Sequence, residues 1–182
     1  MVAINKSKAI FFDRDGVLVK SIIKNRKPFA VKKVADFKIY KNASNLINKV
    51  VNKGYKIFII TNQPDVEKGS ITLKVLNKMH KKLSKKIKVD KIFTCIHKPE
   101  TNCKCRKPSP FMIKKATKIY NINLKKSFVI GDRKSDIESG FKAGCKTIFI
   151  DRNYKEKKPS KQNYTVKNLS SAIRCIENDE IR

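Results

Sequence analysis

The sequence contains no tryptophan, only six glycines and six prolines, and no long apolar segment. A membrane-spanning helix needs about 18 apolar residues in a row, so we expect no membrane association. The first apolar stretch is short and ends in the charged residues Asp13-Arg14-Asp15, which does not fit a secretory signal peptide, and we expect a cytoplasmic protein. With 40% hydrophobic residues, the 182-residue chain has the composition of one folded domain, 1–182, rather than of a disordered chain.

Acidic residues are scarce as well, because 15 Asp and Glu stand against 44 Lys and Arg, giving a net charge of +29. Such a charge attracts polyanions: nucleic acid, an acidic membrane surface or phosphorylated metabolites. The lysines are spread over the whole length, which favours a general compositional bias. Basic strings interleaved with aromatic residues, typical of an RNA-binding groove, are missing. We therefore expect a phosphorylated small molecule as partner and do not expect nucleic acid.

Short apolar strands alternate with amphipathic helices along the chain, which predicts an α/β fold with a central parallel sheet covered on both faces. Residues 17–40 are long for a strand-to-helix connection, and we expect them to form a flap over the site. Because no large cap domain is indicated, the chain is expected to be a monomer. The expected strands are 9–12, 56–60, 91–94, 127–130 and 147–150, and the expected helices are 41–52, 70–86, 110–120, 135–143 and 168–176.

Polar side chains follow four of these strands at the point where each strand ends. In a parallel sheet the carboxyl ends of the strands share one edge, where ligands bind. These clusters therefore predict a site at that edge. They are Asp13 and Asp15, Thr61-Asn62, Cys95 and His97, and Asp132.

Asp13 and Asp15 lie two residues apart, directly after a buried strand and before Gly16. One carboxylate can attack phosphorus, and the second can protonate the leaving oxygen and later deprotonate water. Two close carboxylates also suit Mg²⁺. By itself such a pair is equally compatible with a turn followed by a helix cap.

The other clusters supply groups that a phosphoryl site requires. Asp132 can complete a metal site, and Asp136 is either a supporting group or an ordinary acid in the first turn of a helix. Thr61 and Asn62 can bind phosphoryl oxygens or form a turn or cap. Lys107 can offset negative charge on the phosphoryl group.

The segment Cys95-x-His97-x₅-Cys103-x-Cys105 places three cysteines and one histidine within eleven residues. Four such ligands suit a tetrahedral, structural zinc site. The alternative is a loop with free thiols. Bound zinc would order a loop that has few apolar residues and would fix Arg106 and Lys107 at the mouth of the site. His80 lies in a lysine-rich helix, and the sequence gives it no role.

Together these motifs resemble those of the haloacid dehalogenase superfamily over about residues 8–151. Their order and strand-end placement both agree with the superfamily. The resemblance implies a Rossmann-like three-layer sandwich, Asp13 as nucleophile, Asp15 as acid/base and Lys107 as catalytic lysine. The matching segments are Asp13-Arg14-Asp15-Gly16-Val17, Thr61-Asn62-Gln63, Lys107, and Gly131-Asp132 with Asp136.

The zinc segment gives a narrower resemblance to heptose 1,7-bisphosphate and histidinol phosphatases. It implies Mg²⁺ bound by Asp13, Asp15 and Asp132, one of the first two through its backbone carbonyl. It also implies substrate or phosphate contacts by Thr61, Asn62, Gln63, Arg106 and Arg133. The sequence departs from the family after Gln63, where Pro64–Gly69 replaces an Ala-Arg-Gly pattern, and in the flap.

Three hypotheses follow. The first is a magnesium-dependent phosphatase acting on a sugar bisphosphate, with the 7-phosphate of the heptose 1,7-bisphosphate as leading substrate. The second keeps the chemistry but takes histidinol phosphate or a nucleic-acid 3′-phosphate. The third is a zinc-containing nucleic-acid-binding module, which leaves the strand-end aspartates unexplained.

Overall fold

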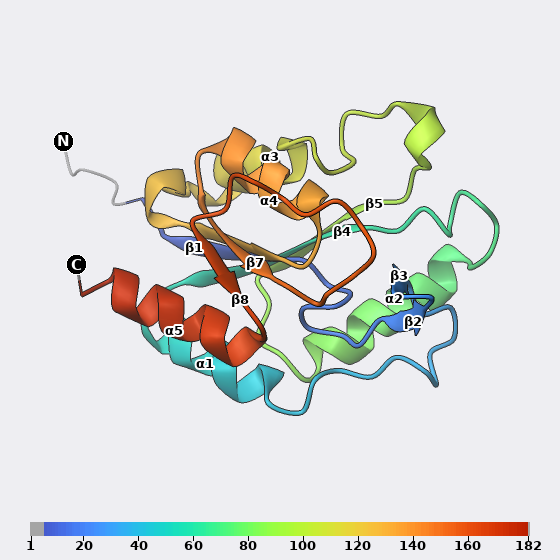
Figure 1. Ribbon diagram of the computed structural model, residues 1–182, viewed down its shortest axis with the longest axis horizontal. Coiled ribbons are helices and arrows are strands. Elements are labelled where there is room, and N and C mark those ends of the chain that lie inside the picture. Colours follow the sequence, from blue (N-terminus) through green and yellow to red (C-terminus); the bar gives the residue numbers. More distant parts are fainter. Residues whose placement is uncertain (1–5, 182) are drawn as a thin grey trace.

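The computed structural model describes residues 6–181 and has a six-stranded sheet at its centre, in the order β5-β4-β1-β6-β7-β8 (Figure 1). Every neighbouring pair in this sheet is parallel, as the sequence predicted. Residues 1–5 and 182 of the expected domain lie outside the described part. The strands are β1 (Ala9–Phe12), β4 (Lys56–Asn62), β5 (Lys91–Cys95), β6 (Phe128–Gly131), β7 (Lys146–Ile150) and β8 (Tyr164–Val166).

Helices cover both faces of the sheet, which confirms the predicted three-layer α/β sandwich (Figure 1). Helices α1, α2 and α5 pack into one core cluster, and α3 and α4 lie on the opposite face. Within residues 6–181, no helix is both long and apolar enough to cross a membrane. The helices are α1 (Ala43–Asn52), α2 (Leu73–Ser84), α3 (Phe111–Tyr120), α4 (Lys134–Ala143) and α5 (Leu169–Asp179).

The central strands are apolar on both sides because each side faces a layer of helices. In β4, Ile57 and Ile59 enter the core formed with α1 and α5, whereas Phe58 and Ile60 point into the core formed with α3. All four residues of β1 are buried. Burying each such side chain contributes about 1.5–3 kcal/mol, so the strand that carries Asp13 is held rigidly.

Local signals set the ends of the helices close to the predicted positions. Thr72 caps α2, since its hydroxyl accepts a hydrogen bond from the Val75 N–H. Gly54 and Gly144 adopt positive φ angles of 84° and 88° just after α1 and α4, a conformation that favours glycine.

A hairpin in the flap and a strand at the edge of the sheet were not predicted. The flap segment contains an antiparallel hairpin, β2 (Ile22–Lys24) and β3 (Lys27–Phe29). Its turn uses Asn25 and Arg26 at positive φ instead of the usual Asn-Gly, so the hairpin signal is weak. Strand β8 is three residues long within a polar segment, and its pairing with β7 comes from the tertiary fold.

Candidate active site

Three of the four predicted strand-end clusters line one cavity of about 360 Å³ at the carboxyl edge of the sheet, whereas Cys95 and His97 are not among its lining residues. Asp13 continues β1, and its N–H donates to the Ile130 carbonyl of β6 at 2.9 Å. Residues from the flap, including Phe29 at the end of β3, form part of the wall. The flap therefore lies over the site, as expected. The lining includes Asp13, Asp15, Thr61, Asn62, Arg106, Lys107, Asp132, Arg133 and Asp136.

Lys107 forms ion pairs with two aspartates at this edge of the sheet. Its buried ammonium lies 2.5 Å from Asp13 Oδ1, 2.6 Å from Asp136 Oδ1 and 2.8 Å from the Ile60 carbonyl oxygen. Burial by itself would lower the pKa of Lys107, but the charges of Asp13 and Asp136 outweigh it and raise that pKa. Lys107 is thus a fixed cation beside the proposed nucleophile.

Asp136 has both of the functions that the sequence left open. One oxygen forms the ion pair with Lys107. The other accepts a hydrogen bond from the Arg133 backbone N–H at 3.0 Å and so caps the start of α4. Through Asp136, the beginning of α4 is tied to the ammonium of Lys107.

The buried carboxylates carry more negative charge than the one buried lysine balances, and such a site suits a bound cation. Ligand oxygens of Asp13, Asp132 and Asp136 lie within 4.8 Å of one another, with one buried lysine among them. Burial raises the pKa of Asp13 to about 7, although Lys107 opposes this, and burial also raises the pKa of Asp132. Asp132 Oδ1 and Asp15 Oδ1 are buried without a hydrogen-bond partner in the described structure. Hard carboxylate oxygens with unused lone pairs fit Mg²⁺.

Gly16 permits this close arrangement. Its φ is +86°, and a Cβ at this position would lie 1.7 Å from Asp132 Oδ2. Asp132 Oδ2 accepts a hydrogen bond from the Tyr154 hydroxyl at 2.8 Å. Burial, together with the charge of Asp132, raises the pKa of Tyr154, so the hydroxyl keeps its proton and remains a donor.

Asp15 is held by the side chains of Arg14 and Gln63, which do not line the cavity. Its Oδ2 accepts hydrogen bonds from Arg14 Nε at 3.0 Å, from Arg14 Nη2 at 2.7 Å and from Gln63 Nε2 at 2.8 Å. Gln63 is fully buried and does not line the cavity. Its amide group contacts Asp15 and Thr61 instead, and the expected substrate contact of Gln63 stays a prediction.

Asn62 joins the second motif to the zinc segment. Its amide group donates to the Lys107 carbonyl at 3.2 Å, and its Oδ1 accepts from the Lys107 N–H at 3.1 Å. The side chain of Asn62 thus positions the lysine, while Asn62 still lines the cavity. Thr61 also lines the cavity, at the end of β4.

The two predicted substrate arginines lie at the mouth of the cavity. Arg106 Nη1 donates to the His97 carbonyl at 3.1 Å, which ties it to the zinc segment. Arg133 forms a bidentate pair with Glu156, at 2.9 and 2.7 Å. Any contact of Arg133 with substrate therefore involves exchange with, or rearrangement of, this pair.

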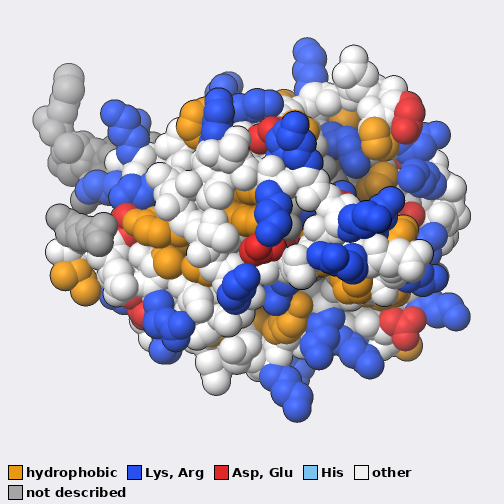
Figure 2. Space-filling model, viewed as in Figure 1, with side chains coloured by type: hydrophobic (Ala, Val, Ile, Leu, Met, Phe, Trp, Pro, Cys, Tyr) orange, Lys and Arg blue, Asp and Glu red, His pale blue; other side chains and the backbone are white. Residues whose placement is uncertain are grey.

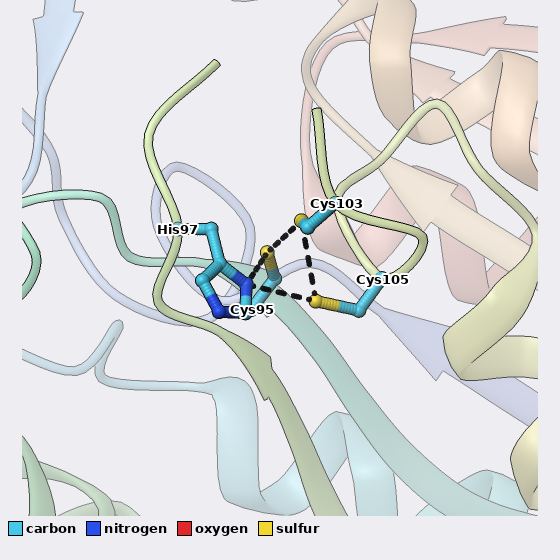
Figure 3. A group of neighbouring side chains, drawn as sticks. All are labelled: Cys95, His97, Cys103 and Cys105. Atoms are coloured by element: carbon cyan, nitrogen blue, oxygen red, sulfur yellow. Dashed lines mark hydrogen bonds between the residues drawn. The ribbon is translucent and has the colours of Figure 1, made fainter. Parts of the chain in front are cut away.

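The four predicted zinc ligands converge (Figure 3). Cys103 Sγ lies 3.5 Å from both Cys95 Sγ and Cys105 Sγ, and His97 Nδ1 lies 3.3 Å from Cys105 Sγ. Around a tetrahedral zinc, neighbouring sulfur ligands are separated by roughly 3.7 Å. Burial would raise the pKa of the Cys103 thiol, but hydrogen bonds from Cys105 and Cys95 outweigh it and lower that pKa to about 6. The geometry is that of a closed four-ligand site.

Comparison with known proteins identifies the family. A family model described as haloacid dehalogenase-like hydrolase matches residues 20–150, which is more than half of the chain. The chain belongs to the haloacid dehalogenase-like hydrolases. The expected superfamily resemblance is thereby confirmed, and so is the expectation of an enzyme.

Among haloacid dehalogenase-like hydrolases, curated relatives are named as heptose bisphosphate phosphatases. D-glycero-beta-D-manno-heptose-1,7-bisphosphate 7-phosphatase of Helicobacter pylori is 36% identical over 152 residues, covering 80% of this chain and 84% of the relative. D-glycero-alpha-D-manno-heptose-1,7-bisphosphate 7-phosphatase of Photorhabdus laumondii is 33% identical over 186 residues, covering 95% and 98%. This chain therefore spans most of the length of both relatives.

A solved structure shares the fold of this chain. D,D-heptose 1,7-bisphosphate phosphatase from B. bronchiseptica, complexed with magnesium and phosphate, superimposes with a TM-score of 0.80 at 24% identity. The match covers 94% of this chain and 99% of that chain. The α/β fold class is thus confirmed.

Arg14, His80 and Tyr154 are site residues that the sequence analysis did not single out. Arg14 lies inside the first motif, but a buried arginine has no signal in a chain with 44 basic residues. Tyr154 follows β7 in a segment without a motif, and only the fold brings it to Asp132.

Proposed function

We propose that this protein is a magnesium-dependent phosphatase that removes the 7-phosphate of D-glycero-D-manno-heptose 1,7-bisphosphate through an aspartyl phosphate. The observation that carries the proposal is the buried Lys107 ammonium between Asp13 and Asp136, at the cavity edge where Asp132 also lies. The names of the relatives at 33–36% identity support the substrate.

Asp13 is the nucleophile. One of its carboxylate oxygens attacks the 7-phosphorus, and the bond between phosphorus and the heptose oxygen breaks. Asp15 gives its proton to that oxygen, then takes a proton from the water that hydrolyses the aspartyl phosphate, which regenerates Asp13. Lys107 and Thr61 hold the phosphoryl oxygens during both steps.

Two metal sites accompany this chemistry. Asp13 and Asp132, through carboxylate oxygens, and Asp15, through its backbone carbonyl, would hold Mg²⁺, which neutralises charge on the phosphoryl group when it is bound. Asp132 Oδ1, which is buried without a protein partner in the described structure, supports this assignment. Cys95, His97, Cys103 and Cys105 would hold a structural Zn²⁺ that fixes Arg106 and Lys107. Arg106 and Arg133, at the mouth, would contact the substrate or its second phosphate.

The test is phosphate release with Mg²⁺ from both anomers of the heptose bisphosphate, from histidinol phosphate and from a 3′-phosphorylated oligonucleotide. We expect the heptose bisphosphate to have the highest kcat/KM. Asp13→Asn should lower kcat by about 10⁴-fold or more, because it replaces the attacking carboxylate with a neutral, poorly nucleophilic amide. Asp36→Asn, an exposed change outside the cavity lining, is the control and should retain activity. Equal activity in Asp13→Asn would refute the mechanism, and a different preferred compound would refute the substrate.

A further inference from the structure

Arg14 is a completely buried cation between the two aspartates of the first motif. A buried charge is costly unless every donor has a partner. Two of its nitrogens, Nε and Nη2, donate to Asp15 Oδ2. A third nitrogen, Nη1, lies 3.1 Å from Nε2 of His80 on α2, and the Phe37 ring lies 5.4 Å from the guanidinium carbon. The guanidinium is therefore fixed from three directions.

His80 must accept the hydrogen bond in this contact. Arginine has only donors, so Nε2 of His80 carries a lone pair and the ring proton is on Nδ1. Burial and the nearby charge of Arg14 lower the pKa of His80 to about 4, which keeps the ring neutral at ordinary pH. His80 thus acts as a neutral acceptor that orients the arginine plane.

The two carboxylate oxygens of Asp15 therefore have different surroundings. Oδ2 receives all three hydrogen bonds, from Arg14 and Gln63. Oδ1 is buried and has no hydrogen-bond partner in the described structure, and Asp15 lines the cavity. This arrangement leaves Oδ1 as the oxygen available to exchange a proton with a ligand.

We propose that His80 is a positioning residue, which acts through Arg14 to hold Asp15 Oδ1 in the orientation needed for proton transfer to the leaving oxygen. This inference rests on the proposed role of Asp15 as general acid. When His80 no longer accepts, the guanidinium loses one of its anchors and Asp15 loses a defined orientation. Binding of the phosphoryl group by Lys107 and Thr61 is unaffected, because neither residue contacts Arg14 or His80 in the hydrogen bonds described.

The experiment compares two leaving groups in His80→Leu, His80→Gln and wild type. A sugar alkoxide needs a proton to leave, whereas p-nitrophenolate leaves without one. The ratio of kcat/KM for the heptose bisphosphate to kcat/KM for p-nitrophenyl phosphate therefore reports general-acid catalysis in the first chemical step. We expect this ratio to fall about 10- to 100-fold in His80→Leu, part of the 10²–10⁴-fold that such catalysis supplies. His80→Gln, whose amide oxygen can accept from Arg14, should recover most of it.

The matched control is Lys81→Leu, the next residue on the same helix, which is exposed and should leave the ratio unchanged. An equal loss with both substrates, no loss with either, or the same ratio in His80→Gln and His80→Leu would overturn the inference.

A second measurement does not depend on activity. In ¹⁵N-labelled wild-type protein at pH 7, NMR should show His80 neutral with its proton on Nδ1. A ring protonated on Nε2 would overturn the inference even in an active enzyme. If the wild type is inactive but His80 carries its proton on Nδ1, the proposed function is refuted and the Arg14–His80 contact stays supported.

Discussion

At the scale of single residues, the site depends on contacts between groups that are distant in the sequence. Asp132 Oδ2 accepts a hydrogen bond from the Tyr154 hydroxyl. The same oxygen lies so close to Gly16 that a side chain at that position would not fit. The other oxygen of Asp132 is buried without a partner in the described structure. Tyr154 therefore holds the carboxylate through Oδ2, and Oδ1 would be available to the proposed Mg²⁺.

Tyr154→Phe tests this orientation. Loss of the donor should weaken divalent-metal binding by about 10- to 100-fold, the usual effect of removing a group that orients a metal ligand. Mn²⁺ titration followed by electron paramagnetic resonance measures the Kd without requiring turnover. Tyr164→Phe is the control, because its hydroxyl interacts with Asp179 instead. An unchanged Mn²⁺ Kd in Tyr154→Phe would show that the hydroxyl has no influence on the metal site.

At the scale of elements, the segment between β5 and α3 supplies Lys107 but makes few apolar contacts of its own. It is attached to the end of β4 by Asn62, and to the loop after β4 by Glu67, whose carboxylate accepts from the Lys98 N–H and from Thr101 Oγ1. The Cys/His cluster brings the same segment to Cys95, at the end of β5. Bound zinc would close the segment into a rigid loop, and this would fix the position of the Lys107 backbone.

We predict about one tightly bound zinc per chain and its loss in Cys103→Ser. Removal of zinc should lower kcat/KM by about tenfold or more, since Arg106 and Lys107 would lose their fixed positions, while the sheet remains folded. Elemental analysis, circular dichroism and phosphate release are the measurements. Cys175→Ser, on α5, should retain zinc and activity. Full activity of zinc-free protein would exclude this structural role.

At the scale of the whole molecule, the net charge of +29 is distributed rather than concentrated. Figure 2 shows Lys and Arg side chains over all parts of the visible face, without a single basic stripe. This distribution agrees with a compositional bias. The long-range field of such a molecule nevertheless attracts anions, and Lys68 and Arg106 lie beside the aspartates in the cavity lining.

Salt should therefore slow substrate binding more than it slows the chemical step. Between low and about 0.5 M ionic strength we expect kcat/KM for the heptose bisphosphate to fall several-fold with little change in kcat, because long-range attraction is screened. Steady-state kinetics at several NaCl concentrations provides the test. The less charged p-nitrophenyl phosphate should show a smaller effect. Equal salt effects on both substrates would mean that the overall field does not contribute.

Much of the fold was predictable because its signals are local. The apolar runs of β1, β4 and β6 are continuous, since both faces of these strands are buried, and such runs are recognisable without a structure. Asp13 and Asp132 directly follow β1 and β6. The short β8 and the Asn25-Arg26 hairpin escaped prediction because pairing partners, rather than local preference, stabilise three-residue strands.

The sequence alone determined the parallel α/β fold, the candidate nucleophile Asp13 and the four candidate zinc ligands, because each depends on a residue type at a strand end or at a short spacing. Only the tertiary structure showed the contacts of Gln63, Arg14, His80 and Tyr154. Their partners lie on other elements: His80 is 66 positions from Arg14, and Tyr154 is 22 positions from Asp132. Contacts of this kind arise only when packing brings those elements together, and no local pattern records them.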